Sequence, residues 1–313
     1  MFTFVPMKHI GYHLLAIFTI AIWGVTFVNT KVLLQYGLQP MEIFLLRFIV
    51  AYLCIWTISP RRLLSEAGNV AELAAQVGEA LKGVDYNIWF IDDSNDNTPE
   101  VLEALCREDT HCHFHHREGD QQTGLATAVI EGFHMADGDF LACMDADLQH
   151  PPKVLRPMYA AMLSGADICV PSRLIRGGSD GGLNIVRKVV SGTARWMGKF
   201  ALSSLRNISD PTSGLFMFRK GMLDGADLRP IGWKIMVEVL AMCEYRLVIE
   251  IPYEFHDRNA GESKISKKVS MQYMEQLKDL RGREIRHDSV IVTRWSPAFT
   301  ESMIRKYCPT EEV

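Results

Sequence analysis

Two long apolar runs, followed by an alternation of shorter apolar and polar segments, divide the chain into parts. Residues 10–34 and 41–58 carry few charges, and each run is close to the ~20 residues with which a helix crosses the hydrocarbon core of a bilayer. The first run is longer than the apolar region of a secretory signal peptide. The sequence therefore predicts a transmembrane hairpin over residues 1–62, with its turn at 35–40.

Basic residues flank this hairpin, with Lys8 at one end and Arg61 and Arg62 at the other. Because basic residues tend to stay on the cytoplasmic side of a membrane, both ends and everything after residue 62 are expected in the cytoplasm. The segments IWGVTFVNTKVLL and LQPMEIFLLRFIVAY resemble the first two helices of the drug/metabolite transporter family. Such carriers have many spans, so a working transporter is not expected from two.

After residue 62 the pattern changes to short strand-like runs separated by helical segments. Strands are predicted near 86–91, 111–116, 140–144 and 167–171, and helices at 70–81, from Thr98 onward, and at 123–135, 154–163 and 184–205. Thr98 is a suitable N-cap, and Pro99 fits the first helical position. This order predicts an α/β domain over residues 63–282, with a mostly parallel sheet covered on both faces.

The strand predicted at 140–144 leads directly to Asp145, Asp147 and Gln149. In an extended chain, side chains at positions i, i+2 and i+4 point to one face, so three oxygen-bearing groups would converge. Mg²⁺ and Mn²⁺ prefer oxygen ligands and keep positions for water and phosphate. The stretch therefore predicts a metal site. The alternative is a solvated acidic turn after a buried strand, because a D-x-D pattern is short.

Composition narrows the classes of function. A net charge of −4 over 313 residues provides no basic excess for binding nucleic acid. The seven cysteines form no CxxC pair, which is typical of reduced thiols and not of a disulfide framework. A hydrophobic content of 48% is enough for a sizeable core. A nucleic-acid-binding protein and a disulfide-rich secreted domain are both disfavoured.

Six segments carry a resemblance to one enzyme family. They are FIDDSNDNTPEVL, GLATAVIEGF, GDFLACMDADLQHPP, PSRLIRGG, DPTSGLFMFR and FHDRNAGESKIS. In order and spacing they resemble polyprenyl-phosphate mannosyltransferases, the dolichol-phosphate mannose synthase type of family-2 glycosyltransferase, over residues 66–282. The resemblance implies a Rossmann-like GT-A fold. It also implies metal-dependent, inverting transfer of a hexose, mannose from GDP-mannose, to a polyprenyl phosphate at the cytoplasmic membrane face.

The resemblance implies roles on the donor side of this reaction. Asp145, Asp147 and Gln149 match the family's site for Mg²⁺ or Mn²⁺, where the ion bridges the diphosphate of the nucleotide sugar. Asp147 is thereby an expected catalytic residue, and Asp145 also contacts the donor. Asp92 and Asp93 match the acidic pair that holds the base and the ribose. On its own, the pair is equally typical of a turn that precedes a helix.

The same resemblance implies further binding residues. Glu66 takes the position of a glutamate that lines the nucleotide pocket, and Arg258 and Lys264 match a loop whose cations close over the diphosphate. Arg173 and Arg187 match the arginines that bind the acceptor phosphate, a task suited to the bidentate guanidinium, and both are expected catalytic residues. Without the motif context, Arg173 is also consistent with a residue that caps a strand end, and Arg187 with one of several cations on a solvated helix face. Arg258 and Lys264 are then consistent with ordinary loop charges.

The predicted helix around residues 184–205 is basic and amphipathic. Arg187, Lys188, Arg195 and Lys199 lie among apolar residues that include Trp196. Such a helix fits a membrane interface. The alternative is a helix whose apolar face packs on the core of its own domain.

Two parts of the chain depart from the resemblance. The family's domain begins with a strand that ends in a Pro-Thr-Tyr-Asn-Glu type of segment, whereas here the match starts only at residues 65–69, so that first strand is missing from the pattern. Residues 283–313 match nothing and contain one short strand-like run.

Three hypotheses about the function of the chain follow from the sequence. A membrane-tethered glycosyltransferase is favoured over a degenerate protein that binds nucleotide sugar or lipid phosphate without turnover, and over a transport-related membrane protein.

Overall fold

A computed structural model describes residues 66–182, 185–229, 231–256, 267–285, 287 and 289–309. The chain divides into two units, Met1–Leu63 and Leu64–Val313, and the described residues belong to the second. The expected transmembrane hairpin over residues 1–62 lies outside the described residues. In the part of the chain that is described, no helix is both long enough and apolar enough to cross a membrane.

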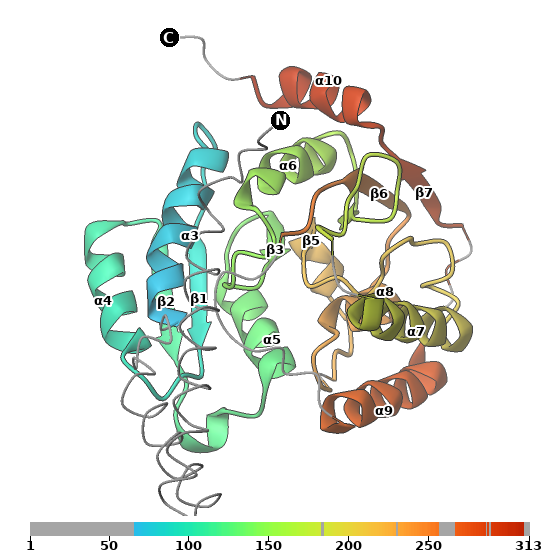
Figure 1. Cartoon of the computed structure of the whole chain (residues 1–313), viewed down its shortest axis with the longest axis horizontal. Helices are drawn as coiled ribbons and strands as arrows, with labels where there is room; N and C mark the ends of the chain where they lie inside the picture. Colours follow the sequence, from blue (N-terminus) through green and yellow to red (C-terminus); the bar gives the residue numbers. More distant parts are fainter. Residues whose placement is uncertain are drawn as a thin grey trace, which may run out of the picture. The chain divides into compact units, whose positions relative to one another are not determined.

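Strands and helices alternate along the described chain (Figure 1). The strands are β1 (Ile88–Asp92), β2 (Cys112–His116), β3 (Phe140–Cys143), β4 (Ile168–Ser172), β5 (Phe216–Arg219), β6 (Leu247–Pro252) and β7 (Ile291–Arg294). The α-helices are α3 (Glu66–Ala80), α4 (Thr98–Glu108), α5 (Leu125–Met135), α6 (Leu155–Leu163), α7 (Ile185–Ala201), α8 (Ile235–Met242), α9 (Lys267–Arg283) and α10 (Pro297–Tyr307). The expected α/β class is confirmed.

The strands form two sheets instead of the single sheet that the sequence predicts. β1 and β2 pair in parallel, and the other strands follow the order β3-β5-β4-β6-β7. In this second sheet β4, β6 and β7 are parallel, whereas β5 is antiparallel to both of its neighbours. Within the described residues, β1 and β3 each pair on one side only. The pattern could not give these directions, because a buried strand is an apolar run in either orientation.

Helices cover both faces of the larger sheet, as predicted. Alternate residues of a strand point to opposite faces, and β4 shows this clearly. Cys169 belongs to an apolar cluster with residues of α3 and α6, whereas Ile168 and Val170 belong to a second cluster with residues of α5, α8 and α9. All five residues of β4 are buried, which explains why its sequence is a continuous apolar run.

The C-terminal residues belong to the same sheet. β7 pairs in parallel with β6, and α10 packs against α6. α10 begins after Ser296, whose hydroxyl accepts a hydrogen bond from the backbone N–H of Phe299 at 3.2 Å, and Pro297 lies in its first turn. The sequence analysis assigned no fold to residues 283–313 and missed this capping signal.

One predicted helix start is also corrected. Thr98 is the first residue of α4 and not its N-cap, which is Asn97. The carboxylate of Asp96 accepts hydrogen bonds from both the backbone N–H and the hydroxyl of Thr98, at 2.9 and 2.5 Å. These hydrogen bonds hold the pKa of Asp96 below its ordinary value. Asp96, one residue before the N-cap, thus accepts from the N–H of Thr98, which is one of the N–H groups at the helix start that have no partner within the helix.

Candidate functional site

The candidate site is built on the turn that follows β3. The strand ends at Cys143, Asp145 follows it without regular secondary structure, and Asp147 and Gln149 lie in the turn and bend that come next. The expectation that strand alternation aligns them is therefore wrong. The backbone N–H of Gln149 donates to Asp147 Oδ1 at 3.1 Å, and Leu148 has a φ of 59°, the only positive φ of a non-glycine residue in the described part. Such a strained backbone persists only where its surroundings hold it, and Leu148 is buried.

Gly214, in the loop before β5, lies directly against the carboxylate of Asp145. A Cβ atom on Gly214 would come within 2.8 Å of Asp145 Oδ2 and 3.6 Å of His150 Nε2. A side chain at this position would therefore displace the carboxylate or the loop. Glycine is typical of places where another group must approach the backbone closely.

Arg173 follows β4 directly and is held by Asp210. Its Nε atom donates a hydrogen bond to Asp210 Oδ2 at 2.9 Å, and its Nη2 atom forms an ion pair with the same oxygen at 2.7 Å. The guanidinium also lies 4.9 Å from the centre of the Phe255 ring. Burial on its own would lower the pKa of Arg173, but Asp210 and Tyr253 outweigh it, so this pKa lies above its ordinary value. Arg173 is therefore a charged group in a fixed orientation.

Lys234 joins these groups, although the sequence analysis did not select it. Its Nζ atom donates to the carbonyl oxygen of Thr212 at 2.8 Å. Burial lowers the pKa of Lys234, Asp145 and Asp210 act in the opposite direction, and Arg173 adds to the lowering. Asp145, Arg173, Asp210 and Lys234 thus form one cluster of interacting charges. The one available signal in the sequence was a lysine directly before the apolar run of α8.

His150 packs in the protein interior next to the turn that contains Asp147 and Gln149. It is buried, its Nδ1 atom lies 3.1 Å from Tyr253 Oη, and the two rings stack. Burial lowers the pKa of His150 to about 4, although Asp147 opposes the shift. The backbone N–H of His256 donates to the carbonyl oxygen of Gln149 at 2.9 Å, which ties the turn to the chain after β6. His150 is a neutral packing group near neutral pH.

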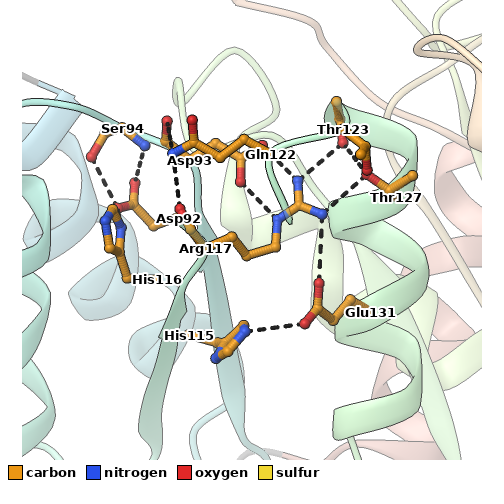
Figure 2. A network of polar contacts seen from close by, with 11 residues as sticks. Asp92, Asp93, Ser94, His115, His116, Arg117, Gln122, Thr123, Thr127 and Glu131 are labelled. Carbon is orange, nitrogen blue, oxygen red and sulfur yellow. Dashed lines mark hydrogen bonds and ion pairs between the residues drawn. The ribbon is translucent and has the colours of Figure 1, made fainter. Parts of the chain in front are cut away.

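Asp92 and Asp93 lie at the carboxyl end of β1, in the two-stranded sheet, and protein groups hold both carboxylates (Figure 2). Arg117 donates from Nε and Nη2 to the two oxygens of Asp93 at 2.7 and 2.5 Å. The Nδ1 atom of His116 lies 2.7 Å from Asp92 Oδ2, which also accepts from the hydroxyl of Ser94 at 2.9 Å. The two carboxylates are thus oriented from within the protein.

Arg117, which the sequence analysis missed, is the centre of this network (Figure 2). Its side chain is only 1% exposed, and it also donates to the carbonyl oxygen of Gly124 and to Thr127 Oγ1, at 3.1 and 3.0 Å. An ion pair of 3.5 Å reaches Glu131. Hydrogen bonding to Asp93 raises the pKa of Arg117 despite its burial. The guanidinium joins the end of β2, the start of α5 and the side chain of Asp93.

The remaining predicted site residues are not tested by the described side chains. Glu66 is the first residue of α3 and Arg187 lies on α7, but the structure describes the side chain of neither. Arg258 and Lys264 lie outside the described residues. Their roles stay predictions.

The predicted metal ligands suit a hard cation. In the described part, no three or more His, Cys, Asp or Glu side chains are arranged to hold a metal ion. The predicted set instead combines two carboxylates, Asp145 and Asp147, with the amide of Gln149. An all-oxygen set with few protein ligands is typical of Mg²⁺ or Mn²⁺, which also bind water and phosphate, and not of zinc. The lack of a side chain at Gly214 allows this loop to lie directly against the carboxylate of Asp145.

Comparison with known proteins also indicates a glycosyltransferase. The family model described as Glycosyl transferase family 2 matches residues 66–225. The dolichol-phosphate mannosyltransferase of Pyrococcus furiosus is 37% identical over 228 residues, which cover 72% of this chain and 64% of that protein. The enzyme of the same name from Saccharomyces cerevisiae is 36% identical over 222 residues, or 67% of this chain and 80% of the relative. The chain thus spans less than two thirds of the Pyrococcus relative.

Among solved structures, glucosyl-3-phosphoglycerate synthase from Mycobacterium tuberculosis is similar in fold. Its complex with Mn²⁺, UDP and glucosyl-3-phosphoglycerate gives a TM-score of 0.53 at 14% identity, over 73% of this chain and 84% of that one. Its complex with UDP gives 0.51 at 16% identity, over 71% and 78%.

The fold is thus the GT-A type of the glycosyltransferases. The chain belongs to glycosyl transferase family 2, and its resemblance to dolichol-phosphate mannosyltransferases is confirmed. The resemblance of residues 8–58 to drug/metabolite transporters is not borne out by these comparisons.

Proposed function

We propose that this chain transfers a hexose from a nucleotide diphosphate sugar to a polyprenyl phosphate, with mannose as the sugar and GDP-mannose as the donor. The similarity to two dolichol-phosphate mannosyltransferases supports the choice of mannose and of a polyprenyl phosphate acceptor. The observation that carries the proposal is the loop at 210–214. It contains Asp210, which fixes the charged Arg173, and Gly214, which touches the metal-site residue Asp145. One short loop therefore links the acceptor-side arginine to the donor-side carboxylate.

On the donor side, Asp145, Asp147 and Gln149 would hold Mg²⁺ or Mn²⁺. Such an ion would supply positive charge that offsets the negative charge developing on the leaving group. Asp92 and Asp93 would receive the ribose and the base. The side chain of Asp93 is 32% exposed despite its two hydrogen bonds from Arg117, so a ligand can reach it.

On the acceptor side, positioning takes the place of base catalysis. A phosphate monoester is largely anionic near neutral pH, so it attacks the anomeric carbon without a protein base. Arg173 and Arg187 would bind its oxygens, and attack opposite the leaving diphosphate would invert the anomeric centre. Arg258 and Lys264 would close over the diphosphate, and Glu66 would line the nucleotide pocket.

We place the site at the cytoplasmic face of a membrane, where a polyprenyl phosphate presents its head group. α7 supports this placement. Ala194 and Met197 pack on the core, whereas Trp196 and Phe200 are 67% and 71% exposed and stack with their ring centres 5.7 Å apart. Exposed aromatic residues on a basic helix fit the interface of a bilayer. The hairpin at residues 1–62 would provide a second tether.

A second candidate is a protein that binds nucleotide sugar or lipid phosphate without turnover. The observation that favours it is the division of the strands into two sheets, because β1 and β3 each pair on one side only within the described residues. Nucleotide binding that is measured separately from sugar transfer distinguishes the two candidates.

The test is an assay of the full chain with Mg²⁺ or Mn²⁺, a panel of nucleotide sugars and a short polyprenyl phosphate. We expect transfer from GDP-mannose that EDTA abolishes, and a loss of about 100-fold in Asp147→Asn, because an amide is a poorer cation ligand than a carboxylate. Asp224→Asn, at an exposed aspartate, is the matched control. Binding without transfer from any donor would favour the second candidate, and normal turnover in Asp147→Asn would remove the metal assignment.

A further inference from the structure

The backbone of Lys234 is fixed by two helices. The residue directly precedes α8, in which every side chain is buried. Its carbonyl oxygen accepts hydrogen bonds from the backbone N–H of Val237 at 3.1 Å and from Gln276 Nε2, on α9, at 3.2 Å. The long side chain of Lys234 therefore starts from a rigid base.

From this base the ammonium group reaches the loop at 210–214. Its hydrogen-bond acceptor is the carbonyl oxygen of Thr212, which lies between Asp210 and Gly214 in the sequence. Thr212 is itself buried. Lys234 thus contacts the same short loop that fixes Arg173 and approaches Asp145.

No carboxylate of the described residues contacts the ammonium group of Lys234. Within the described residues it forms one hydrogen bond, to a neutral carbonyl group, and no ion pair. The two carboxylates that act to raise its pKa, Asp145 and Asp210, have other contacts. Although Lys234 as a residue is only partly buried, burial of its ammonium group lowers its pKa.

An enclosed ammonium group without a contacting anion is destabilised, because its charge has lost part of its hydration and gained no counter-charge. A bound anion would offset this cost, and the anionic groups of the proposed reaction are phosphates. A lysine ammonium is a compact point charge, whereas the guanidinium of Arg173 is a planar fork. Because Lys234 contacts the loop that carries Asp210, the ion-pair partner of Arg173, both cations are available to one phosphate site.

We propose that Lys234 is a further phosphate-binding residue of the transfer site, which binds a phosphoryl oxygen of the donor diphosphate or of the acceptor phosphate together with Arg173. This inference deepens the proposed function and rests on it. The alternative is a structural role, in which Lys234 only ties the start of α8 to the loop at 210–214. That role requires the hydrogen bond to Thr212 but not the positive charge.

The test uses Lys234→Gln in the full chain, because its amide still donates a hydrogen bond toward Thr212 but has no charge. Calorimetry measures the affinity for GDP with Mn²⁺ and, separately, for a short polyprenyl phosphate. We expect a 10- to 100-fold loss of affinity for one phosphate ligand, as the removal of a charge-assisted hydrogen bond implies. Lys220→Gln is the matched control, since Lys220 also donates to a backbone carbonyl group, that of Ala136.

A loss confined to GDP assigns Lys234 to the donor diphosphate, and a loss confined to the lipid phosphate assigns it to the acceptor. Lys234→Arg, which keeps the charge, should retain most of the binding, and it provides the comparison if the glutamine variant is unstable. Wild-type affinities in Lys234→Gln for both ligands overturn the inference and leave the proposed function standing. Phosphate binding without hexose transfer in the wild type overturns the function alone, and no phosphate binding in the wild type overturns both.

Discussion

Arg173 and Asp210 form a one-sided ion pair. Two guanidinium nitrogens contact the same atom, Asp210 Oδ2: Nε donates a hydrogen bond to it at 2.9 Å, and Nη2 forms an ion pair with it at 2.7 Å. The other carboxylate oxygen, Oδ1, is buried and has no hydrogen-bond partner in the part of the chain that the structure describes. A buried acceptor without a partner costs about 1–3 kcal/mol. The pair therefore favours a fixed orientation of Arg173 over maximal stability.

Removal of Asp210 should be costly for this reason. We expect Asp210→Ala to lower the free energy of unfolding by about 3–5 kcal/mol, because Arg173 is left as an enclosed cation without its counter-ion. The double variant Arg173→Met with Asp210→Leu should regain most of this stability while transfer stays lost. Urea denaturation of both variants and of the wild type measures the effect. A cost below about 1 kcal/mol in Asp210→Ala would show that the pair is not structural.

Gly214→Ala should damage the metal turn selectively. The new Cβ atom would lie 2.8 Å from Asp145 Oδ2, so the carboxylate has to move. Because small displacements of reacting groups are costly, we expect transfer to fall by about 10- to 100-fold, with weaker Mn²⁺ binding. Gly221→Ala is the control, since a Cβ atom there meets only Asp224 Oδ2, at 3.9 Å. Equal activity in the two variants would contradict the proposed closeness of Gly214 to the site.

Arg117→Lys should weaken nucleotide binding indirectly, because Arg117 orients Asp93 and is not itself proposed to contact the nucleotide. Lysine keeps the charge but cannot make the two parallel hydrogen bonds to Asp93 while it also reaches Gly124 and Thr127. We expect about 10-fold weaker GDP binding, measured by calorimetry, together with a loss of about 2–4 kcal/mol in stability. In the control Arg107→Lys, which alters an exposed pair, both quantities should stay within about 0.5 kcal/mol of the wild type. Unchanged GDP affinity in Arg117→Lys would separate Asp93 from the nucleotide site.

Stability should fall in alkaline solution, and Cys243 contributes to the fall. Burial, with a smaller effect from Glu238, raises the pKa of this thiol from 9.0 to about 12. The folded state therefore keeps a proton that the unfolded state has lost, so the contribution is complete below pH 9 and disappears as the pH rises toward 12. Urea denaturation at several pH values in this window should give a shallower slope for Cys243→Ala, by up to about 1.4 kcal/mol per pH unit. Parallel slopes would mean that the thiol does not titrate differently on unfolding.

The sequence alone determined the local features of the protein. β4 was predicted within a residue of its bounds, because a fully buried strand is a continuous apolar run. The residues at the ends of strands, including Asp93, Asp145 and Arg173, could be selected because their type and spacing follow known motifs. Periodicity and motif spacing are properties of neighbouring positions, so one sequence is enough to reveal them.

Only the tertiary structure decided which distant groups meet. No pattern indicated that Asp210 would fix Arg173, that Gly214 would touch Asp145, or that a lysine before α8 would reach the same loop. The separation of β1 and β2 from the larger sheet, and the reversed direction of β5, were equally unpredictable. These relationships depend on which apolar surfaces pack together after the chain folds. They join positions that are far apart in the sequence. Hydrophobic patterning constrains only the structure of residues that are neighbours in the sequence.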